Sequence, residues 1–73
     1  MNFIKIGNQI FSRRTIERVF IEKERNSKGL FSYFIYVLTC DEPIKTTEHE
    51  TIYQAECALD EIYKMLNTEI IKE

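Results

Sequence analysis

The segment Leu30-Phe31-Ser32-Tyr33-Phe34-Ile35-Tyr36-Val37-Leu38-Thr39-Cys40 is the most strongly patterned part of the chain. It is rich in aromatic and β-branched residues, which fit the pleated, half-buried surface of a β-strand. Side chains alternate between the two faces of a strand. One face carries Leu30, Phe34, Tyr36 and Leu38, and the other carries Phe31, Tyr33, Ile35 and Val37. Both faces are apolar, so the segment is predicted to be a central strand that needs cover on both sides.

Shorter segments around it alternate apolar and polar residues, a pattern typical of strands. The predicted strands, in chain order, are residues 3–6, 9–11, 16–25, 30–40 and 44–48. Glycine supplies the positive φ that tight turns need, so Gly7 is expected in a type II′ hairpin turn and Gly29 in the turn before the central strand. The alternation slips near Ile16, which predicts a bulge, and the polar last strand is expected at a sheet edge.

Residues 51–67 are predicted to form an amphipathic helix. Apolar residues recur there at steps of three and four, which places them on one stripe. The stripe consists of Ile52, Ala55, Leu59, Ile62 and Leu66. Thr51 is the expected N-cap, with Gln54 completing a capping box, and Thr47 with Glu50 is an earlier alternative. The chain from Thr68 onward is expected to fray.

Strands first and a helix last indicate an α+β fold in a single domain, residues 1–73. We expect an antiparallel five-stranded meander packed against one C-terminal helix. One helix covers one face of a sheet, whereas the central strand is apolar on both. Either the sheet curls strongly onto itself, or its second face meets another chain, and we expect a homodimer.

The segments Phe3–Phe11 (FIKIGNQIF) and Ala58–Asn67 (ALDEIYKMLN) resemble small uncharacterised bacterial and phage proteins. Those proteins are similar to half of a pleckstrin-homology-type barrel, a curled meander closed by a C-terminal helix. The resemblance implies this fold and an accessory role, inhibiting or regulating a host machine, and it carries over no catalytic residues. The segment Ser12-Arg13-Arg14 departs from the pattern, because such proteins more often have small turn-forming polar residues there.

Composition favours a folded, soluble, cytoplasmic protein. No run of residues approaches the roughly 20 apolar residues of a membrane span, and the N-terminus lacks the apolar core of a signal peptide. Cys40 and Cys57 are too few and too far apart for a disulfide framework or a CxxC motif, so they are expected to be reduced, partly buried thiols. No membrane partner and no cofactor is expected.

Charge is distributed unevenly along the chain, whose formal net charge is −2. Residues 1–29 contain seven basic and three acidic side chains, a net charge of +4. Residues 41–73 contain nine acidic and three basic side chains, a net charge of −6, and the central strand is uncharged. Such an asymmetry bears on partners and association rather than on the fold.

The candidates for enzyme chemistry are His49, Cys40 and Cys57. A nucleophile needs a base within hydrogen-bond reach and a third group that orients the base. His49 stands between glutamates near the start of the helix, a position typical of a solvated surface residue. A metal site would need more ligands than one histidine and two distant cysteines. We therefore expect a non-enzymatic protein without a bound metal.

Two kinds of partner are suggested by the remaining residues. For a protein partner, the candidate contact residues are aromatic, because aromatic side chains are enriched at interface hot spots. They are Phe31, Tyr33, Phe34, Tyr36 and Tyr53. For the alternative, a nucleic acid bound by basic strands with interleaved aromatic rings, the candidates are basic. They are Arg13, Arg14, Arg18, Arg25 and Lys28, with Arg13 and Arg14 expected to reach outward from a loop. The acidic isoelectric point, about 5.4, makes a protein partner the favoured hypothesis.

Overall fold

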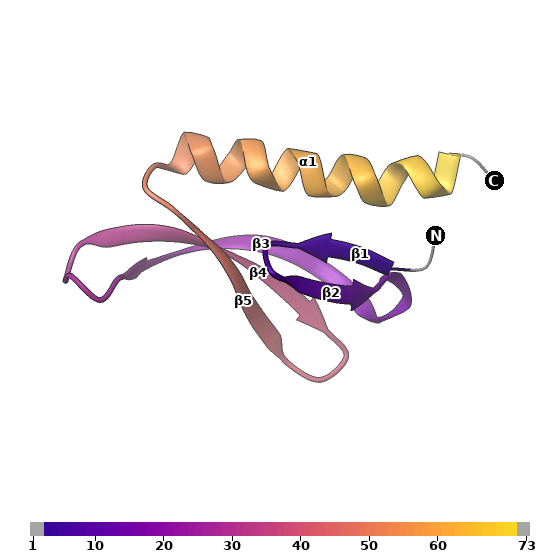
Figure 1. Ribbon diagram of the computed structural model, residues 1–73, viewed down its shortest axis with the longest axis horizontal. Coiled ribbons are helices and arrows are strands. Elements are labelled where there is room, and N and C mark those ends of the chain that lie inside the picture. Colours follow the sequence, from indigo (N-terminus) through magenta and orange to yellow (C-terminus); the bar gives the residue numbers. More distant parts are fainter. Residues whose placement is uncertain (1–2, 72–73) are drawn as a thin grey trace.

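The computed structural model describes residues 3–71, in which antiparallel strands are followed by one helix packed on them (Figure 1). The elements are β1 (Phe3–Ile6), β2 (Gln9–Ser12), a 3-10 turn (Arg13–Thr15), β3 (Ile16–Arg25), β4 (Phe31–Thr39), β5 (Pro43–His49) and α1 (Ile52–Ile71). The α+β class, the order of the elements and the central strand are thus confirmed. Strand bounds agree with the sequence-based prediction to within one residue at either end.

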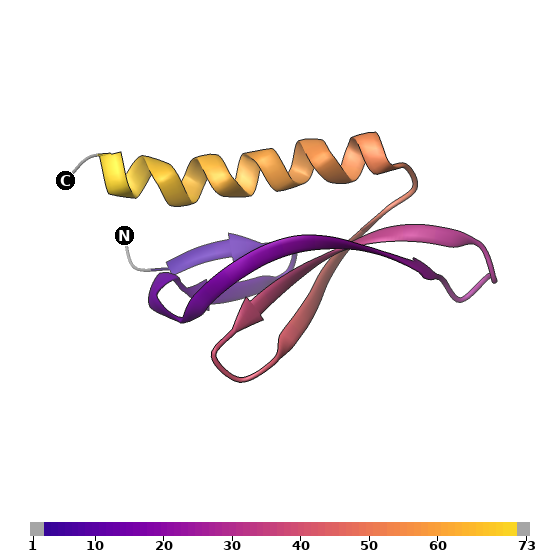
Figure 2. The same ribbon diagram turned by 180° about the vertical axis from the view of Figure 1, so that it is seen from behind.

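The strands form two separate sheets, which corrects the predicted single meander. β1 pairs only with β2, and the second sheet has the order β3-β4-β5. β2 does not pair with β3 because the 3-10 turn intervenes, closed by a hydrogen bond of 2.9 Å from the Thr15 hydroxyl to the Ser12 carbonyl. Neither sheet is closed or curled, so the alternative of a strongly curled sheet is wrong. The β1–β2 hairpin instead lies at one end of the larger sheet, beneath the C-terminal half of α1 (Figures 1 and 2).

Two irregularities interrupt the register of the three-stranded sheet. The first lies between Ile16 and Arg18, which confirms the predicted bulge at the start of β3. The second lies in β5 at Thr46, where Ile35 pairs with Thr47 and Tyr36 pairs with Lys45. The Thr46 hydroxyl donates to the Ile35 carbonyl at 2.7 Å, so the extra residue of this second bulge is held by its own side chain.

The start of α1 follows the capping pattern in the sequence. The Gln54 amide donates to the Thr51 hydroxyl at 3.1 Å, and the Gln54 side chain accepts from the Glu50 amide at 3.2 Å. Thr51 is therefore the N-cap, as predicted. The helix continues to Ile71, four residues beyond the predicted end at Asn67, so the expected fraying from Thr68 is wrong up to that point. Residues 72 and 73 lie outside the described residues.

The core lies between α1 and one face of the β3-β4-β5 sheet. Ile35 and Val37 of β4 are fully buried there with Val19 of β3 and Ile62 of α1, and the β1–β2 hairpin adds its own apolar face to the same cluster. A polar tie joins the layers, because the Tyr63 hydroxyl donates to the Val19 carbonyl at 2.8 Å. The face of β4 that meets the helix is therefore the one that carries Ile35 and Val37.

The β3–β4 hairpin is longer than the helix that covers it. A helix of 20 residues is about 30 Å long, whereas the molecule extends 44 Å along its longest axis. Both views show the turn of this hairpin projecting beyond the first residue of α1 (Figures 1 and 2). The end of the hairpin therefore carries part of the core-side face of the sheet into solvent. Within residues 3–71, α1 lacks the apolar length that a membrane crossing would require.

Candidate interaction surface

The structure distributes the five aromatic candidates over three places. Phe31 and Tyr33 lie on the core-side face of β4, near the end of the projecting hairpin. Phe34 and Tyr36 lie on the opposite, outer face of the same strand. Tyr53 stands on the solvent side of α1, where it is 73% exposed. They do not form one surface, so each place must be judged separately.

The outer face has no layer of backbone over it, yet its aromatic rings are largely covered. Phe34 is only 7% exposed. The ammonium group of Lys45, from β5, lies 4.2 Å from the centre of the Phe34 ring and 5.9 Å from that of Tyr36. Phe20 stacks on Tyr36 with ring centres 5.6 Å apart, and the Arg18 guanidinium lies over Phe20 at 5.0 Å. Long charged side chains thus cover much of this face.

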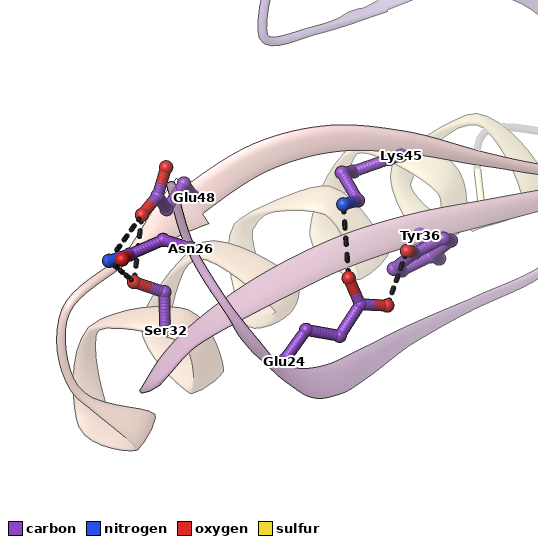
Figure 3. Close-up of polar contacts among 6 residues, drawn as sticks. All are labelled: Glu24, Asn26, Ser32, Tyr36, Lys45 and Glu48. Carbon is purple, nitrogen blue, oxygen red and sulfur yellow. Dashed lines mark hydrogen bonds and ion pairs between the residues drawn. The ribbon is translucent and has the colours of Figure 1, made fainter. Parts of the chain in front are cut away.

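A carboxylate holds that cover in place (Figure 3). Glu24 accepts a hydrogen bond of 2.5 Å from the Tyr36 hydroxyl and pairs with the Lys45 ammonium at 3.0 Å. The hydrogen bond from Tyr36, followed by that from Lys45, holds the pKa of Glu24 below its ordinary value of 4.5. The same carboxylate raises the pKa of Tyr36 and that of Lys45. The three groups therefore fix one another across β3, β4 and β5.

A second polar cluster on the outer face stiffens the end of the hairpin. The Ser32 hydroxyl, buried in β4, donates to the Glu48 carboxylate at 2.7 Å and accepts from the Asn26 side-chain amide at 2.8 Å (Figure 3). The carbonyl oxygen of the Asn26 side chain accepts from the backbone amides of Lys28 and Leu30. Asn26 therefore closes the turn by the hydrogen bonding typical of asparagine in turns, and it anchors that turn to two strands.

The end of the hairpin presents an apolar and cationic surface, formed by its core-side face together with Leu30 of the adjoining turn, which we call the tip surface. It consists of Lys23, Arg25, Leu30, Phe31 and Tyr33. Phe31 is 51% exposed and Leu30 is 64% exposed. The Lys23 ammonium and the Arg25 guanidinium lie 4.7 Å and 4.5 Å from the centre of the Phe31 ring. Register explains the grouping, since Arg25 pairs with Phe31 and Lys23 with Tyr33 on one face.

Among residues 3–71, the structure gives the cations of the tip surface no carboxylate partner. In the part of the chain that the structure describes, Lys23 contacts aromatic rings, and Arg25 adds only a hydrogen bond of 2.6 Å to the Gly29 carbonyl. Lys28, in the turn, is exposed. Positive charge therefore remains available beside an exposed aromatic ring, which is a composition typical of binding surfaces.

The basic candidates for nucleic-acid binding are also dispersed. Arg25 and Lys28 belong to the end of the hairpin, and Arg18 lies over Phe20 on the outer face. Arg14 is exposed in the 3-10 turn. Arg13 does not reach outward, which corrects the sequence-based expectation. Its guanidinium donates to the Met65 carbonyl at 2.5 Å and to the Leu66 carbonyl at 3.4 Å, so it ties the turn to α1.

The solvent side of α1 carries charge of the opposite sign. Tyr53, Glu56, Cys57 and Asp60 follow one another at steps of three and four, and all are exposed. We call these four residues the acidic stripe. Within the described residues, the carboxylates of Glu56 and Asp60 have no ion-pair partner. Sequence reasoning named Tyr53 as a candidate contact residue but did not join it to its acidic neighbours.

The candidates for catalysis are not brought together. His49 is half-buried and its Nε2 lies 2.9 Å from the Thr47 hydroxyl. It pairs with Tyr33, so Cys40 follows seven residues further along β4, about 23 Å away in an extended strand. Both cysteines are exposed free thiols, which corrects the expectation that they are partly buried. Over residues 3–71, no cluster of three or more histidine, cysteine or acidic side chains is arranged to hold a metal ion.

The fold and its surfaces define a small α+β domain in which one helix packs on two antiparallel sheets. Comparisons of the chain with protein-family models, with curated proteins and with solved structures found no match. The surfaces that bear on function are therefore the tip surface, the acidic stripe and the outer face.

Proposed function

We propose that this protein is a non-enzymatic protein-binding module whose contact surface is the tip surface. The observation that supports the proposal is the exposure of Phe31, on the core-side face of a hairpin that projects beyond its covering helix, and of Leu30 in the adjoining turn. Both side chains are more than half exposed. Exposed aromatic and apolar side chains beside cations suit a partner surface that is both apolar and acidic.

The rigidity of the hairpin end supports the same role. Asn26, Ser32 and Glu48 hold the turn from the outer face, so the core-side residues are presented on a fixed support. A surface that is already ordered loses little conformational freedom when it binds. The tip surface therefore has a feature that distinguishes a contact site from an incidental group of exposed residues.

Nucleic-acid binding is the second candidate, because cations and aromatic rings on an antiparallel sheet can bind phosphates and stack on bases. Two observations favour a protein. Lys23 and Arg25 already lie over the Phe31 ring, so a stacked base would have to displace them. The formal net charge of −2 also opposes binding to a polyanion in general.

The experiment is a titration of the ¹⁵N-labelled protein with three probes. They are an amphipathic acidic peptide rich in Glu, Leu and Tyr, the same peptide with Lys in place of Glu, and an oligothymidylate. We expect the acidic peptide to shift the amide signals of residues 23–33, with an affinity that falls as salt is added.

The matched variants for this titration are Phe31→Ser and Phe3→Ser. Both remove an exposed phenylalanine from a strand, but Phe3 lies in β1, away from the tip surface. Phe31→Ser should abolish the shifts and Phe3→Ser should preserve them. If none of the probes shifts residues 23–33, the proposed function is wrong. If only the oligothymidylate shifts them, the nucleic-acid alternative replaces it.

A further inference from the structure

We infer that the partner of the tip surface is the acidic stripe of a second copy of this chain. The inference rests on the proposed function and names its partner. In this arrangement Lys23 and Arg25 of one copy face Glu56 and Asp60 of the other, and Phe31 and Leu30 pack beside Tyr53 of the other copy.

Charge complementarity within a single chain is the first argument. The tip surface holds two cations without carboxylate partners, and the acidic stripe holds two carboxylates without ion-pair partners, among residues 3–71. Two copies of an acidic protein repel each other on average, so an association must juxtapose patches of opposite sign. The tip surface and the acidic stripe are two such patches, and the two cations of the first equal in number the two carboxylates of the second.

The position of the two surfaces is the second argument. The turn of the β3–β4 hairpin, which adjoins the tip surface, lies beyond the first residue of α1, and the acidic stripe begins at Tyr53, in the first turn of that helix. Both surfaces are therefore near the same end of the molecule. The tip surface faces the helix side of the sheet, whereas the stripe faces away from the sheet. A copy turned by 180° can thus place its stripe on the tip surface while its own tip surface covers the first copy's stripe.

The size of the contact favours such a reciprocal, two-fold arrangement. A stable interface buries about 800 Å² on each partner, more than five side chains at the end of one hairpin provide. In a two-fold dimer each copy contributes both surfaces, so the contact area is doubled and every contact occurs twice. The chain then closes into a dimer rather than an open filament.

The experiment is a charge exchange measured by sedimentation velocity over a range of protein concentrations. One variant, Lys23→Glu/Arg25→Glu, reverses the tip surface, and another, Glu56→Lys/Asp60→Lys, reverses the acidic stripe. We expect the wild type to dimerise more weakly at high salt. Each reversal should weaken the homodimer by at least about 100-fold, because like charges then face each other twice. An equimolar mixture of the two variants should restore dimers.

Two matched controls reverse equal numbers of charges elsewhere. Lys5→Glu/Arg14→Glu changes exposed cations of β1 and of the 3-10 turn, and Glu17→Lys/Glu22→Lys changes exposed carboxylates of β3. Both should alter dimerisation by less than about threefold, since they lie outside the contact. Circular dichroism verifies that all four variants are folded.

A wild type that stays monomeric at every concentration would overturn this inference, as would a dimer that survives reversal of the tip surface. A mixture of the two reversed variants that fails to associate would overturn it too. None of these results touches the proposed function, which fails separately if the acidic peptide leaves the signals of residues 23–33 unmoved.

Discussion

Glu24 is the residue that joins the aromatic outer face to its charged cover. It lies on β3, and its two oxygens bind groups from the other two strands of the sheet, the Tyr36 hydroxyl and the Lys45 ammonium. Lys45 in turn lies over the ring of Phe34. The burial of the Phe34 ring by Lys45 therefore depends on the Glu24 carboxylate, which holds Lys45 in place.

This arrangement predicts a pH dependence of stability. The pKa of Glu24 is lowered in the folded protein, first by the Tyr36 hydroxyl, so its ionised form stabilises the fold above the unfolded value of about 4.5. That contribution is lost as the pH falls through the lower, folded pKa. In urea titrations, the stability gap between wild type and Glu24→Gln should be full at neutral pH and should shrink below about pH 4.5.

Glu22 provides the control for this measurement. It is an exposed carboxylate of the same strand and the same face, and among the described residues it has no hydrogen-bond partner. Glu22→Gln should follow the wild-type profile at every pH. If the stability difference between wild type and Glu24→Gln is the same at neutral and acidic pH, the ionised Glu24 carboxylate does not carry the interaction.

On the outer face, the contacts of individual side chains were the hardest feature to predict from the sequence. The alternation of β4 places Phe34 and Tyr36 on one side, but it does not say what covers them. Lys45 is distant in sequence from Phe34 and reaches it only because β5 pairs with β4 at that register. Arg13 shows the same limit, since its bonds to the Met65 and Leu66 carbonyls depend on where α1 is placed.

The β1–β2 hairpin is attached to the rest of the molecule without strand pairing. Its turn packs on β5, where a Cβ at Gly7 would lie 2.8 Å from the Thr47 methyl carbon, and the Gln9 side chain donates to the Lys45 carbonyl at 3.0 Å. Gly7 has φ of +63°, in the left-handed region that other residues adopt at a cost. Gly7 therefore serves both the turn and its close approach to β5.

Alanine substitutions at the two glycines separate these two requirements, the backbone conformation of the turn and its close approach to β5. Gly29 also has a positive φ, +80°, but a Cβ there would meet nothing within 4 Å. Gly29→Ala should cost about 1–2 kcal/mol for the backbone conformation alone. Gly7→Ala should cost about 1–3 kcal/mol more, because its methyl group crowds Thr47. Urea unfolding measures both, and equal losses would mean that the turn does not pack closely on β5.

The elements were predicted well where local chemistry decides them. The positive φ of Gly7 and Gly29, the bulge after Ile16 and the Thr51 cap are all properties of short segments, and all are confirmed. The separation into two sheets was missed, because alternation of residues shows that β2 and β3 are strands but not whether they pair. The helix was also predicted to end too early, at Asn67, whereas it continues through Thr68, a weaker helix former.

The whole molecule has one core, and a chain of 73 residues leaves little reserve of stability, about 4–11 kcal/mol for a typical domain of this length. Ile35 is at the centre of that core and is fully buried. The side chains around it come from both sheets and from α1. Loss of packing there affects every layer at once.

Ile35→Ala should therefore destabilise the protein by about 2–5 kcal/mol, through lost burial and the cavity left behind. Ile10→Ala is the matched control, since Ile10 is an exposed isoleucine of a strand, and it should change stability by less than about 0.5 kcal/mol. Both are measured by urea unfolding. Comparable losses for the two variants would contradict the placement of the core.

β1 begins and α1 ends at the same end of the molecule, opposite the turn of the β3–β4 hairpin (Figures 1 and 2). A tether attached through either terminal segment therefore leaves the tip surface pointing away from the attachment point. Immobilised on a sensor chip or displayed on a particle by that end, the protein would expose the hairpin turn to the surrounding solution without redesign.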